Sequence, residues 1–316
     1  MVSPNQGGEL LWRHLVHVIS WLNWGFSGMG SRGGKTGPKG PINVQLLRQK
    51  HQSDMIYDKT AREKKADMWH TLPVTVNGYT YDARYSEEAY RDVLRPLLER
   101  LADLQAVASG RTVVYFAGPP AAGKSTVALL LELLSRDVPG CEVQAVGLDG
   151  FHHYNAYLRS HTIVRDGTEM PLAAIKGAPE SFDVEKFARA VTLLHEDATV
   201  PWPVYDRTIH DPRENAVQVT APIVVVEGNY LLLAEEPWAS LAPLADYTVF
   251  LSADEADLRE RAVTRKAKGG ISRAEAEAHY DRTDGPNIRR ALEHSRAADF
   301  TIRLASDGDL RPVPAV

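Results

Sequence analysis

The stretch TVVYFAGPPAAGKSTVALLLELL, residues 112–134, constrains the fold more than any other part of the chain. It contains Gly118, four further residues and then Gly123, Lys124 and Ser125, which is the G-x-x-x-x-G-K-[ST] pattern of a phosphate-binding loop. Glycines let the backbone curl so that its N–H groups point at phosphate oxygens, and a helix that begins at Lys124 adds its positive end. Because the pattern lies between a strand-like and a helix-like run, it predicts a nucleoside triphosphate site.

The cofactors predicted for this loop are ATP and Mg²⁺. Lys124 would bring its positive charge to the β- and γ-phosphates, and the Ser125 hydroxyl would bind the magnesium ion. A glycine-rich turn with an exposed lysine is the structural alternative, and the strand-to-helix context argues against it. The residues predicted to bind the nucleotide are Gly118, Pro119, Pro120, Ala121, Ala122, Gly123, Lys124, Ser125 and Thr126.

Residues 110–306 alternate between strand-like and helix-like runs, which defines the main predicted domain. Apolar runs predict strands at 112–118, 143–149, 222–228, 247–252 and 299–304. Helical spacing of apolar residues predicts helices between them, notably over 124–135 and 184–196. Strands that are apolar on both faces and separated by helices predict an α/β fold, with a five-stranded parallel sheet covered by helices on both faces. Together with the phosphate loop, this is the P-loop containing nucleoside triphosphate hydrolase fold.

The N-terminal part is predicted to add an appendage to this domain. Residues 1–70 include a run rich in Gly, Lys and Pro without periodicity, which predicts a disordered extension or an upstream start codon. Within 71–109, alternating runs flank Asn77-Gly78, a pair that suits a type I′ hairpin, and Ser86 is a candidate N-cap for the helix that follows. Residues 307–316 are predicted to be a tail.

Composition argues against several classes of partner. The chain of 316 residues has a formal net charge of -5 and a pI near 6.1, whereas nucleic-acid binders usually carry a basic excess. The apolar stretch 9–26 is interrupted by charged and polar residues, so we expect no membrane span. Cys141 is the one cysteine, which fits a reducing, cytoplasmic location. A homodimer is the one assembly that we consider.

Two carboxylates end predicted strands of the sheet. Asp149 follows the run VQAVGL, and Glu227 follows IVVV. Ligands of open α/β sheets bind at the carboxyl ends of strands, so Asp149 should face the γ-phosphate and Glu227 should hold magnesium or bind substrate. Gly150 would let the substrate approach.

The next residues are His152 and His153. Adjacent residues on an extended segment point to opposite sides, so we expect one histidine to face the substrate and the other to pack. We take His153 as the residue that binds substrate. Zinc binding is the weaker alternative because no Cys and no further His lies at ligand spacing.

Two charged or polar stretches point towards a kinase. The stretch LRERAVTRKAKGG, 258–270, places Arg261 and Arg265 on one helical face, where they could act as a lid that neutralises the transferring phosphoryl group. A solvated helical face is the alternative. The stretch VPWPVYDRTIHDP, 200–212, reads as a Pro-rich loop whose Tyr205 and His210 could line a site for a polar small molecule.

These motifs together resemble the phosphoribulokinase/uridine kinase family of P-loop kinases, which includes bacterial pantothenate kinase. The resemblance covers roughly residues 110–305 and rests on GPPAAGKST, LDGFHHY, KGAPESFD, VYDRTIH and VVVEGNYLL. An uncharacterised bacterial branch of nucleoside or nucleotide kinase-like proteins is also similar, and shares RTDGPN. The stretch TDGPN, 283–287, departs from both uridine kinase and pantothenate kinase, which leaves the acceptor open.

The resemblance implies a role for each matched residue. Asp149 would be the general base, and Lys124, Arg261 and Arg265 would stabilise the transferring group. Ser125 and Glu227 would hold the metal, and Asp149, His153, Tyr205, His210 and Glu227 would contact the substrate.

The predicted function is ATP-dependent transfer of the γ-phosphoryl group to a hydroxyl of a small metabolite, such as a sugar, a nucleoside or a pantothenate-like compound. The sequence contains no N-K-x-D pattern of the kind that recognises guanine, which argues against a GTPase. The alternative function is a nucleotide-binding regulatory P-loop protein without metabolite kinase activity.

Overall fold

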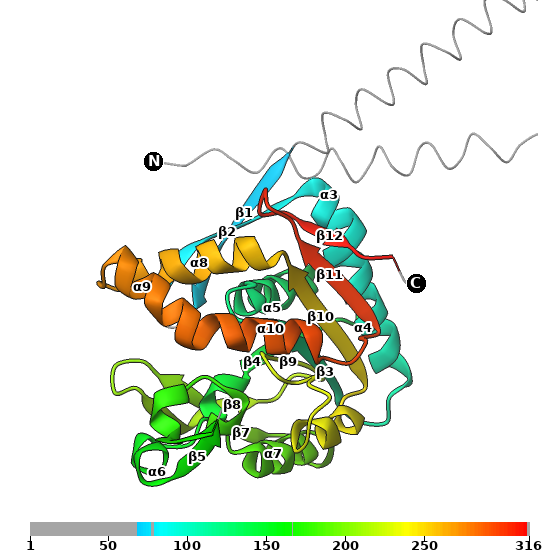
Figure 1. The fold of residues 1–316 in the computed structure, drawn as a ribbon. Coiled ribbons are helices and arrows are strands. Elements are labelled where there is room, and N and C mark those ends of the chain that lie inside the picture. The colour runs from blue at the N-terminus through cyan, green and yellow to red at the C-terminus, as the bar shows by residue number, and fades with distance from the viewer. Residues whose placement is uncertain (1–67, 77–78, 166, 315–316) are drawn as a thin grey trace, which may run out of the picture. The chain divides into compact units, whose positions relative to one another are not determined.

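The main sheet of the chain has six strands in the order β12-β11-β10-β3-β9-β4 in the computed structural model, which describes residues 68–76, 79–165 and 167–314 (Figure 1). Five of them run parallel, which confirms the predicted parallel sheet. They are β3 (Thr112–Ala117), β4 (Val143–Gly147), β9 (Ile223–Gly228), β10 (Tyr247–Ala253) and β11 (Phe300–Leu304). The sixth, β12 (Leu310–Pro312), pairs antiparallel with β11 at the edge, and was not predicted.

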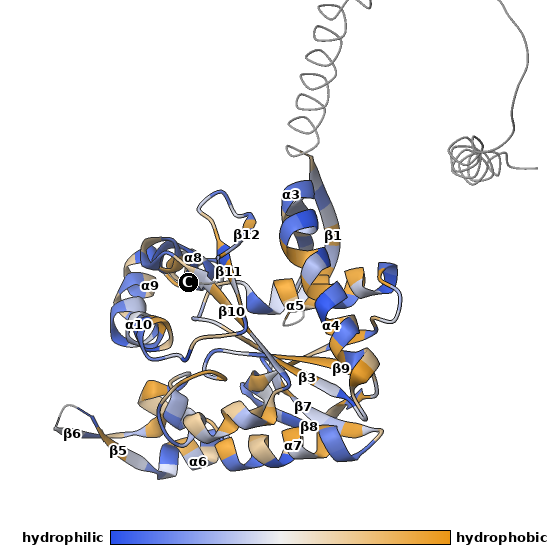
Figure 2. Cartoon of the chain, turned by 90° about the vertical axis from the view of Figure 1, so that its right-hand side faces the viewer, coloured by the Kyte–Doolittle hydropathy of each residue, from blue (hydrophilic) through white to orange (hydrophobic). Residues whose placement is uncertain are grey.

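Side chains of the central strands alternate between two cores. Along β3, Val114 and Phe116 join the core on one face of the sheet, and Val113 and Tyr115 join the core on the other. Helices α4 (Arg95–Val107), α5 (Lys124–Leu134) and α8 (Glu255–Lys268) contribute to the first core, and α7 (Val184–Glu196) and η6 (Trp238–Leu244) to the second. Strand β9 is coloured as hydrophobic in Figure 2. Its valines are buried, as expected for a strand of a parallel sheet that is covered on both faces.

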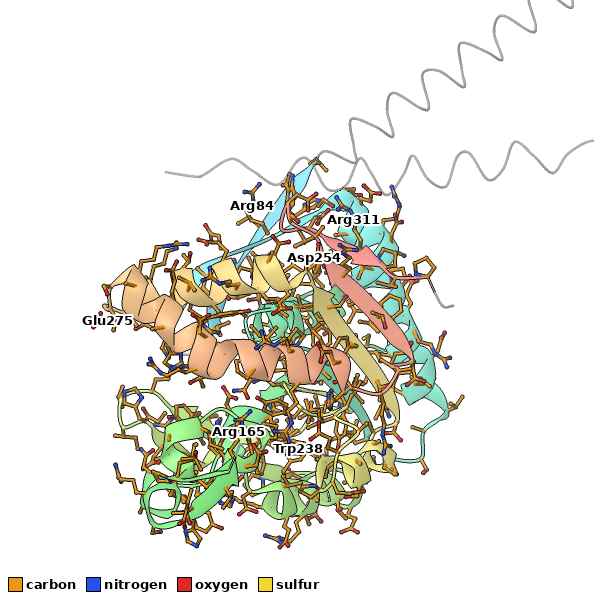
Figure 3. The ribbon with its side chains drawn as sticks, in the orientation of Figure 1. Arg84, Arg165, Trp238, Asp254, Glu275 and Arg311 are labelled. Atoms are coloured by element: carbon orange, nitrogen blue, oxygen red, sulfur yellow. The ribbon has the colours of Figure 1, made fainter. Side chains whose placement is uncertain are left out.

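Aromatic rings fill much of the second core. Trp238, labelled in Figure 3, is 2% exposed and packs edge-on against Phe182 and Tyr230. Phe151 makes similar contacts with Phe187 and Trp202, at ring-centroid distances of 5.1 and 4.9 Å. These edge-to-face contacts fix the segment after β4 against α7.

The N-terminal hairpin and helix are present as predicted. Strands β1 (Trp69–Val76) and β2 (Tyr79–Ser86) pair antiparallel with Val76 opposite Tyr79, so the last two residues of the predicted extension 1–70 belong to a strand. The Asn77-Gly78 pair and residues 1–67 lie outside the described residues. Ser86 caps the helical segments α3 (Glu87–Ala89), η1 (Tyr90–Leu94) and α4 by accepting the Ala89 N–H. Its hydroxyl donates to the buried carboxylate of Asp309, so the segment before β12 is joined to the N-terminal helix.

The Pro-rich stretch at 200–212 is a β-hairpin, so the predicted loop is wrong. Strands β7 (Val200–Asp206) and β8 (Asp211–Val219) pair antiparallel, with a register irregularity between Trp202 and Val204. Proline cannot donate to a ladder, but a two-stranded ribbon with a bulge leaves positions where no donor is needed. The shorter elements before β9 are η2 (Ser135–Asp137), η3 (Leu148–Phe151), α6 (Asn155–Ser160), β5 (Thr162–Arg165), β6 (Thr168–Pro171), η4 (Leu172–Ile175) and η5 (Pro179–Ser181).

The TDGPN stretch lies in a bent helical run. It consists of α9 (Arg273–His279), the π-turn η7 (Tyr280–Asp284) and α10 (Gly285–Glu293), and packs beside α8 (Figure 1). A Cβ at Gly285 would lie 2.9 Å from the Tyr280 ring, which explains the glycine at this position. Within the described part of the chain, no helix combines the length and apolar character needed to cross a membrane.

Candidate active site

The phosphate loop lies between β3 and α5, where the sequence predicted it. Gly123 adopts φ 94° and Ala121 adopts φ 66°, so the backbone turns sharply just before the helix begins at Lys124. A Cβ at Gly118 would lie 2.4 Å from the Leu251 carbonyl oxygen, which restricts this position to glycine. No side chain caps the start of α5, so its first N–H groups are free for an anion.

Lys124 is buried at the centre of the loop. Its Nζ donates to the Pro119 carbonyl at 2.9 Å and to Asn229 Oδ1 at 2.6 Å. Burial lowers the pKa of the Lys124 amine to about 8, although the nearby charges of Glu227 and Asp149 oppose this shift. The positive charge of Arg265 contributes to this lowering of the Lys124 pKa. A buried cation held by two neutral oxygens is poised to accept a phosphate oxygen as a stronger partner.

Ser125 and Glu227, the two predicted metal residues, lie together. The Ser125 hydroxyl donates to Glu227 Oε1 at 2.7 Å, at the carboxyl end of β9. Burial raises the pKa of Glu227, with the Lys124 charge acting in the opposite direction. In the residues that the structure describes, no three His, Cys, Asp or Glu side chains group into a metal site. This donor set fits Mg²⁺, because that ion is usually held by one or two protein groups together with phosphate oxygens and water.

Asp149 lies on η3, directly after β4 and two strands away from the phosphate loop. Its carboxylate is 45% exposed, and its charge acts on the pKa of both Lys124 and Glu227. Gly150 has a different role from the predicted one. A Cβ there would lie 2.2 Å from the Pro203 carbonyl oxygen, so this glycine admits the β7 strand rather than a substrate.

The predicted lid arginines lie on α8 beside the phosphate loop. Arg261 Nε donates to the Ala121 carbonyl at 2.8 Å, and burial lowers the pKa of its guanidinium. Arg265 lies close enough to Lys124 for its charge to lower the lysine pKa. As whole residues Arg261 and Arg265 are exposed, but the hydrogen bond from Arg261 ties this face of α8 to the loop, which favours a role at the phosphates over the alternative of a purely solvated face.

Tyr205 and His210 lie at the tip of the β7–β8 hairpin. Tyr205 is near Asp149, since its ring is 5.3 Å from the His152 ring, and the His152 Nδ1 contacts the Asp149 carbonyl at 2.8 Å. The His210 side chain is exposed, while its backbone, at φ 55°, presents the carbonyl to the Tyr205 hydroxyl at 2.8 Å. The structure thus brings Tyr205 to the site and gives His210 contacts through its backbone.

The two adjacent histidines have different surroundings. His152 packs on Phe182 at 3.8 Å between ring centroids, and burial lowers its pKa. His153 stacks on Tyr157 at 4.1 Å between ring centroids. These contacts favour His152 for the role that we assigned to His153. The backbone geometry after η3 decides this, and the sequence pattern did not contain it.

Two further residues at the site, Asn229 and Tyr81, were not predicted, and a third, Arg207, belongs to the polar stretch 200–212 but was not assigned a role. Asn229 holds Lys124, and its position two residues after Glu227 in EGN was the available signal. Arg207 Nη2 lies 4.0 Å from Asp149 Oδ2. Tyr81, on β2 of the N-terminal hairpin, contacts the Thr126 hydroxyl at 2.5 Å, a long-range contact that no local motif signals.

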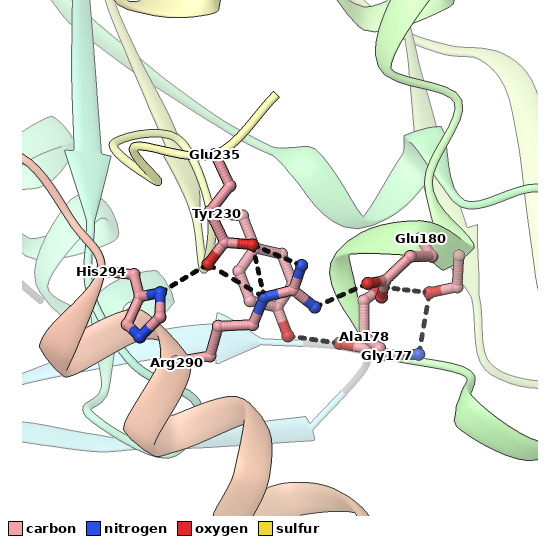
Figure 4. Close-up of polar contacts among 8 residues, drawn as sticks. Gly177, Ala178, Glu180, Tyr230, Glu235, Arg290 and His294 are labelled. Carbon is pink, nitrogen blue, oxygen red and sulfur yellow. Dashed lines mark hydrogen bonds and ion pairs between the residues drawn. The ribbon is translucent and has the colours of Figure 1, made fainter. Parts of the chain in front are cut away.

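A polar cluster behind the site joins three segments (Figure 4). Arg290 on α10 donates to Glu180 at 2.7 Å and to Glu235 at 2.7 Å, and His294 contacts Glu235 at 2.7 Å. Hydrogen bonds from Arg290 lower the pKa of Glu235. The cluster therefore links the C-terminal helical run to the KGAPES segment that precedes α7.

Comparison with known proteins gives relatives over most of the described domain. No family model matches the sequence. Uncharacterized protein YggC of Escherichia coli K12 is 44% identical over 240 residues, which cover 75% of this chain and 97% of YggC. A Schizosaccharomyces pombe protein described as a candidate uridine kinase, C227.14, is 31% identical over 200 residues. The match covers 61% of this chain and 83% of the S. pombe protein.

A solved structure is similar over the same region. It is described as a candidate fructose transport system kinase from Silicibacter sp. TM1040, with 31% identity and a TM-score of 0.57. The match covers 64% of this chain and 98% of that protein.

Proposed function

Because the chain belongs to the phosphoribulokinase/uridine kinase family of P-loop kinases, we propose that it transfers the γ-phosphoryl group of ATP to a hydroxyl of a small metabolite. One observation carries the proposal. The carboxylate of Asp149 and the Ser125–Glu227 pair lie close enough to the buried Lys124 amine, at neighbouring strand ends, for their charges to act on one another. Carboxylate, cation and metal-binding groups in one place are what phosphoryl transfer requires.

The protein side of the reaction follows from this arrangement. ATP supplies the phosphoryl group, and Mg²⁺ held by Ser125 and Glu227 would offset phosphate charge. Lys124 and the α8 arginines would stabilise negative charge on the transferring group. Asp149 would accept the proton of the acceptor hydroxyl through a carboxylate oxygen, as its partial exposure beside the loop allows.

Acceptor-dependent consumption of ATP tests this proposal against the regulatory alternative. A kinase should consume ATP only when its alcohol is present, and Lys124→Ala should abolish that consumption. A regulatory protein should bind Mg-ATP with no dependence on any hydroxyl compound. The positions of Arg261 and Asp149 around the loop support the kinase.

Binding of ATP should take up protons above neutral pH. The pKa of unliganded Lys124 is about 8, so much of its amine is neutral at pH 8.5, and phosphate groups favour the charged form. Affinity for a non-hydrolysable Mg-ATP analogue should therefore fall as the pH rises through about 8, with uptake of roughly half a proton or more at pH 8.5 and little at pH 6.5. Calorimetric titration in two buffers of different protonation enthalpy measures the uptake.

The control for this titration is Lys124→Arg, whose guanidinium stays charged throughout this pH range. It should bind the analogue without proton uptake. Equal uptake at pH 6.5 and 8.5 in the unsubstituted protein would contradict the assignment of Lys124.

A further inference from the structure

The residues around Asp149 that come from η3, the KGAPES segment and the β7–β8 hairpin form a group, here called the acceptor side. Strand β4 is an edge strand of the main sheet, and the β7–β8 hairpin packs on η3, which follows β4. The acceptor side consists of Asp149, His152, Lys176, Tyr205 and Arg207. An acceptor hydroxyl that gives its proton to Asp149 would place the rest of its molecule among these side chains.

Among the residues that the structure describes, Lys176 has no carboxylate hydrogen-bond partner. Its Nζ donates to Asn155 Oδ1 at 2.6 Å and to the His210 carbonyl at 2.8 Å, which leaves one of its three N–H donors unused. The same Nζ lies 5.0 Å from the centre of the Tyr205 ring. Burial lowers the pKa of Lys176 and the charge of Asp211 opposes this shift, but one oxygen of Asp211 already accepts the Asn155 N–H at 2.7 Å.

Arg207 is a second cation beside the same tyrosine. Its guanidinium lies 5.9 Å from the Tyr205 ring centre and is 48% exposed. Within the described residues, Asp149 is the one carboxylate within 4.0 Å of this guanidinium, and a separation of 4.0 Å is beyond hydrogen-bond range. The donors of the guanidinium fork therefore remain available for a ligand.

The phosphates of ATP have cations of their own in the loop and on α8. Lys124 lies in the loop, and Arg261 and Arg265 lie on α8. Lys176 and Arg207 come instead from the KGAPES segment and from the hairpin tip, and each lies within 6 Å of the centre of the Tyr205 ring, at 5.0 and 5.9 Å. With a neutral acceptor, the carboxylates that the described residues offer these two cations are Asp149, 4.0 Å from Arg207, and Asp211, whose charge acts on Lys176.

We infer that the acceptor carries an anionic group, a carboxylate or a phosphate, in addition to the hydroxyl that is phosphorylated, and that Arg207 and Lys176 bind this group. The inference rests on the proposed function, because it assigns the acceptor side of the same site. Arg207 suits the anion because a guanidinium can bind carboxylate or phosphate oxygens in a bidentate manner. Lys176 adds a fixed point charge, and the Tyr205 ring gives the acceptor a surface close to both.

Anion binding to the nucleotide-loaded protein tests this inference without knowledge of the natural acceptor. The protein is saturated with a non-hydrolysable Mg-ATP analogue, so that the phosphate loop is filled, and is then titrated with inorganic phosphate, with glycerate and with glycerol. We expect one of the two anions to bind and glycerol not to bind. Arg207→Gln and Lys176→Gln should each weaken that binding by about 10-fold or more, with analogue affinity unchanged.

The matched control is Arg213→Gln, which removes the same charge from the same hairpin. Arg213 is 63% exposed and lies 4.0 Å from Asp206, so its loss should leave anion binding unchanged. The anion that binds distinguishes a carboxylate acceptor from a phosphorylated one. Absence of anion binding to the loaded protein, or equal binding in both Gln variants, would overturn the inference. Failure to bind the Mg-ATP analogue at all would overturn the proposed function and this inference with it.

Discussion

Asp149→Asn is expected to lower kcat by about 100-fold or more while the affinity for Mg-ATP changes little. The amide keeps the size of the side chain but cannot accept the acceptor proton at neutral pH. Nucleotide affinity should persist because the loop contacts of Lys124, Ser125 and Arg261 do not involve Asp149 directly. Steady-state kinetics with the identified acceptor measures kcat, and titration with an ATP analogue measures affinity.

A matched carboxylate on the hairpin controls for a general loss of negative charge. Asp206 accepts hydrogen bonds from Thr208 and faces Arg213, so Asp206→Asn should keep kcat near that of the unsubstituted protein. If Asp149→Asn turned over at the original rate, Asp149 would not be the base. If both variants lost activity equally, a general electrostatic effect would explain the loss instead.

Arg290→Met is expected to lower the free energy of unfolding by about 2 kcal/mol. Arg290 is 23% exposed and donates to Glu180 and Glu235, so its removal deprives two partly buried carboxylates of the cation that they share (Figure 4). For a unit of this size the melting temperature should fall by about 4–8 °C. Thermal unfolding followed by circular dichroism measures the change.

Arg289→Met on the same helix is the control for this prediction. Arg289 pairs with Glu255 at 3.0 Å, but both side chains are nearly half exposed, and exposed pairs contribute about 1 kcal/mol at most. Its melting temperature should change much less than that of Arg290→Met. Equal effects of the two substitutions would show that the Glu180–Arg290–Glu235 cluster has no special structural role.

Local sequence patterns were sufficient for the parts of the fold that depend on local chemistry. The parallel sheet follows from apolar runs, and the turn before α5 follows from Gly123. The Ser86 N-cap follows from the residue type at a helix start. That Asp149 and Glu227 lie at strand ends on one edge of the sheet follows from the parallel arrangement, and their roles stay predictions.

Features that depend on packing between distant segments were not predictable in this way. Gly150 was interpreted as room for substrate, but it makes room for Pro203 of the hairpin. The choice between His152 and His153 depends on backbone angles after η3, and the Tyr81 contact joins residues 45 positions apart. Proline in 200–212 suggested a loop because the irregular ribbon that accommodates it has no simple sequence signature.

The most direct test of the central claim is a screen for ATP-dependent phosphorylation among sugars, sugar acids, nucleosides and vitamin precursors. The protein is incubated with each candidate and Mg-ATP, and products are detected by mass spectrometry, with Lys124→Ala as the inactive control. We predict that at least one hydroxyl compound gains a single phosphoryl group with the unsubstituted protein and not with Lys124→Ala. Binding of Mg-ATP without any phosphorylated product across the whole set would contradict the kinase assignment and favour a regulatory nucleotide-binding protein.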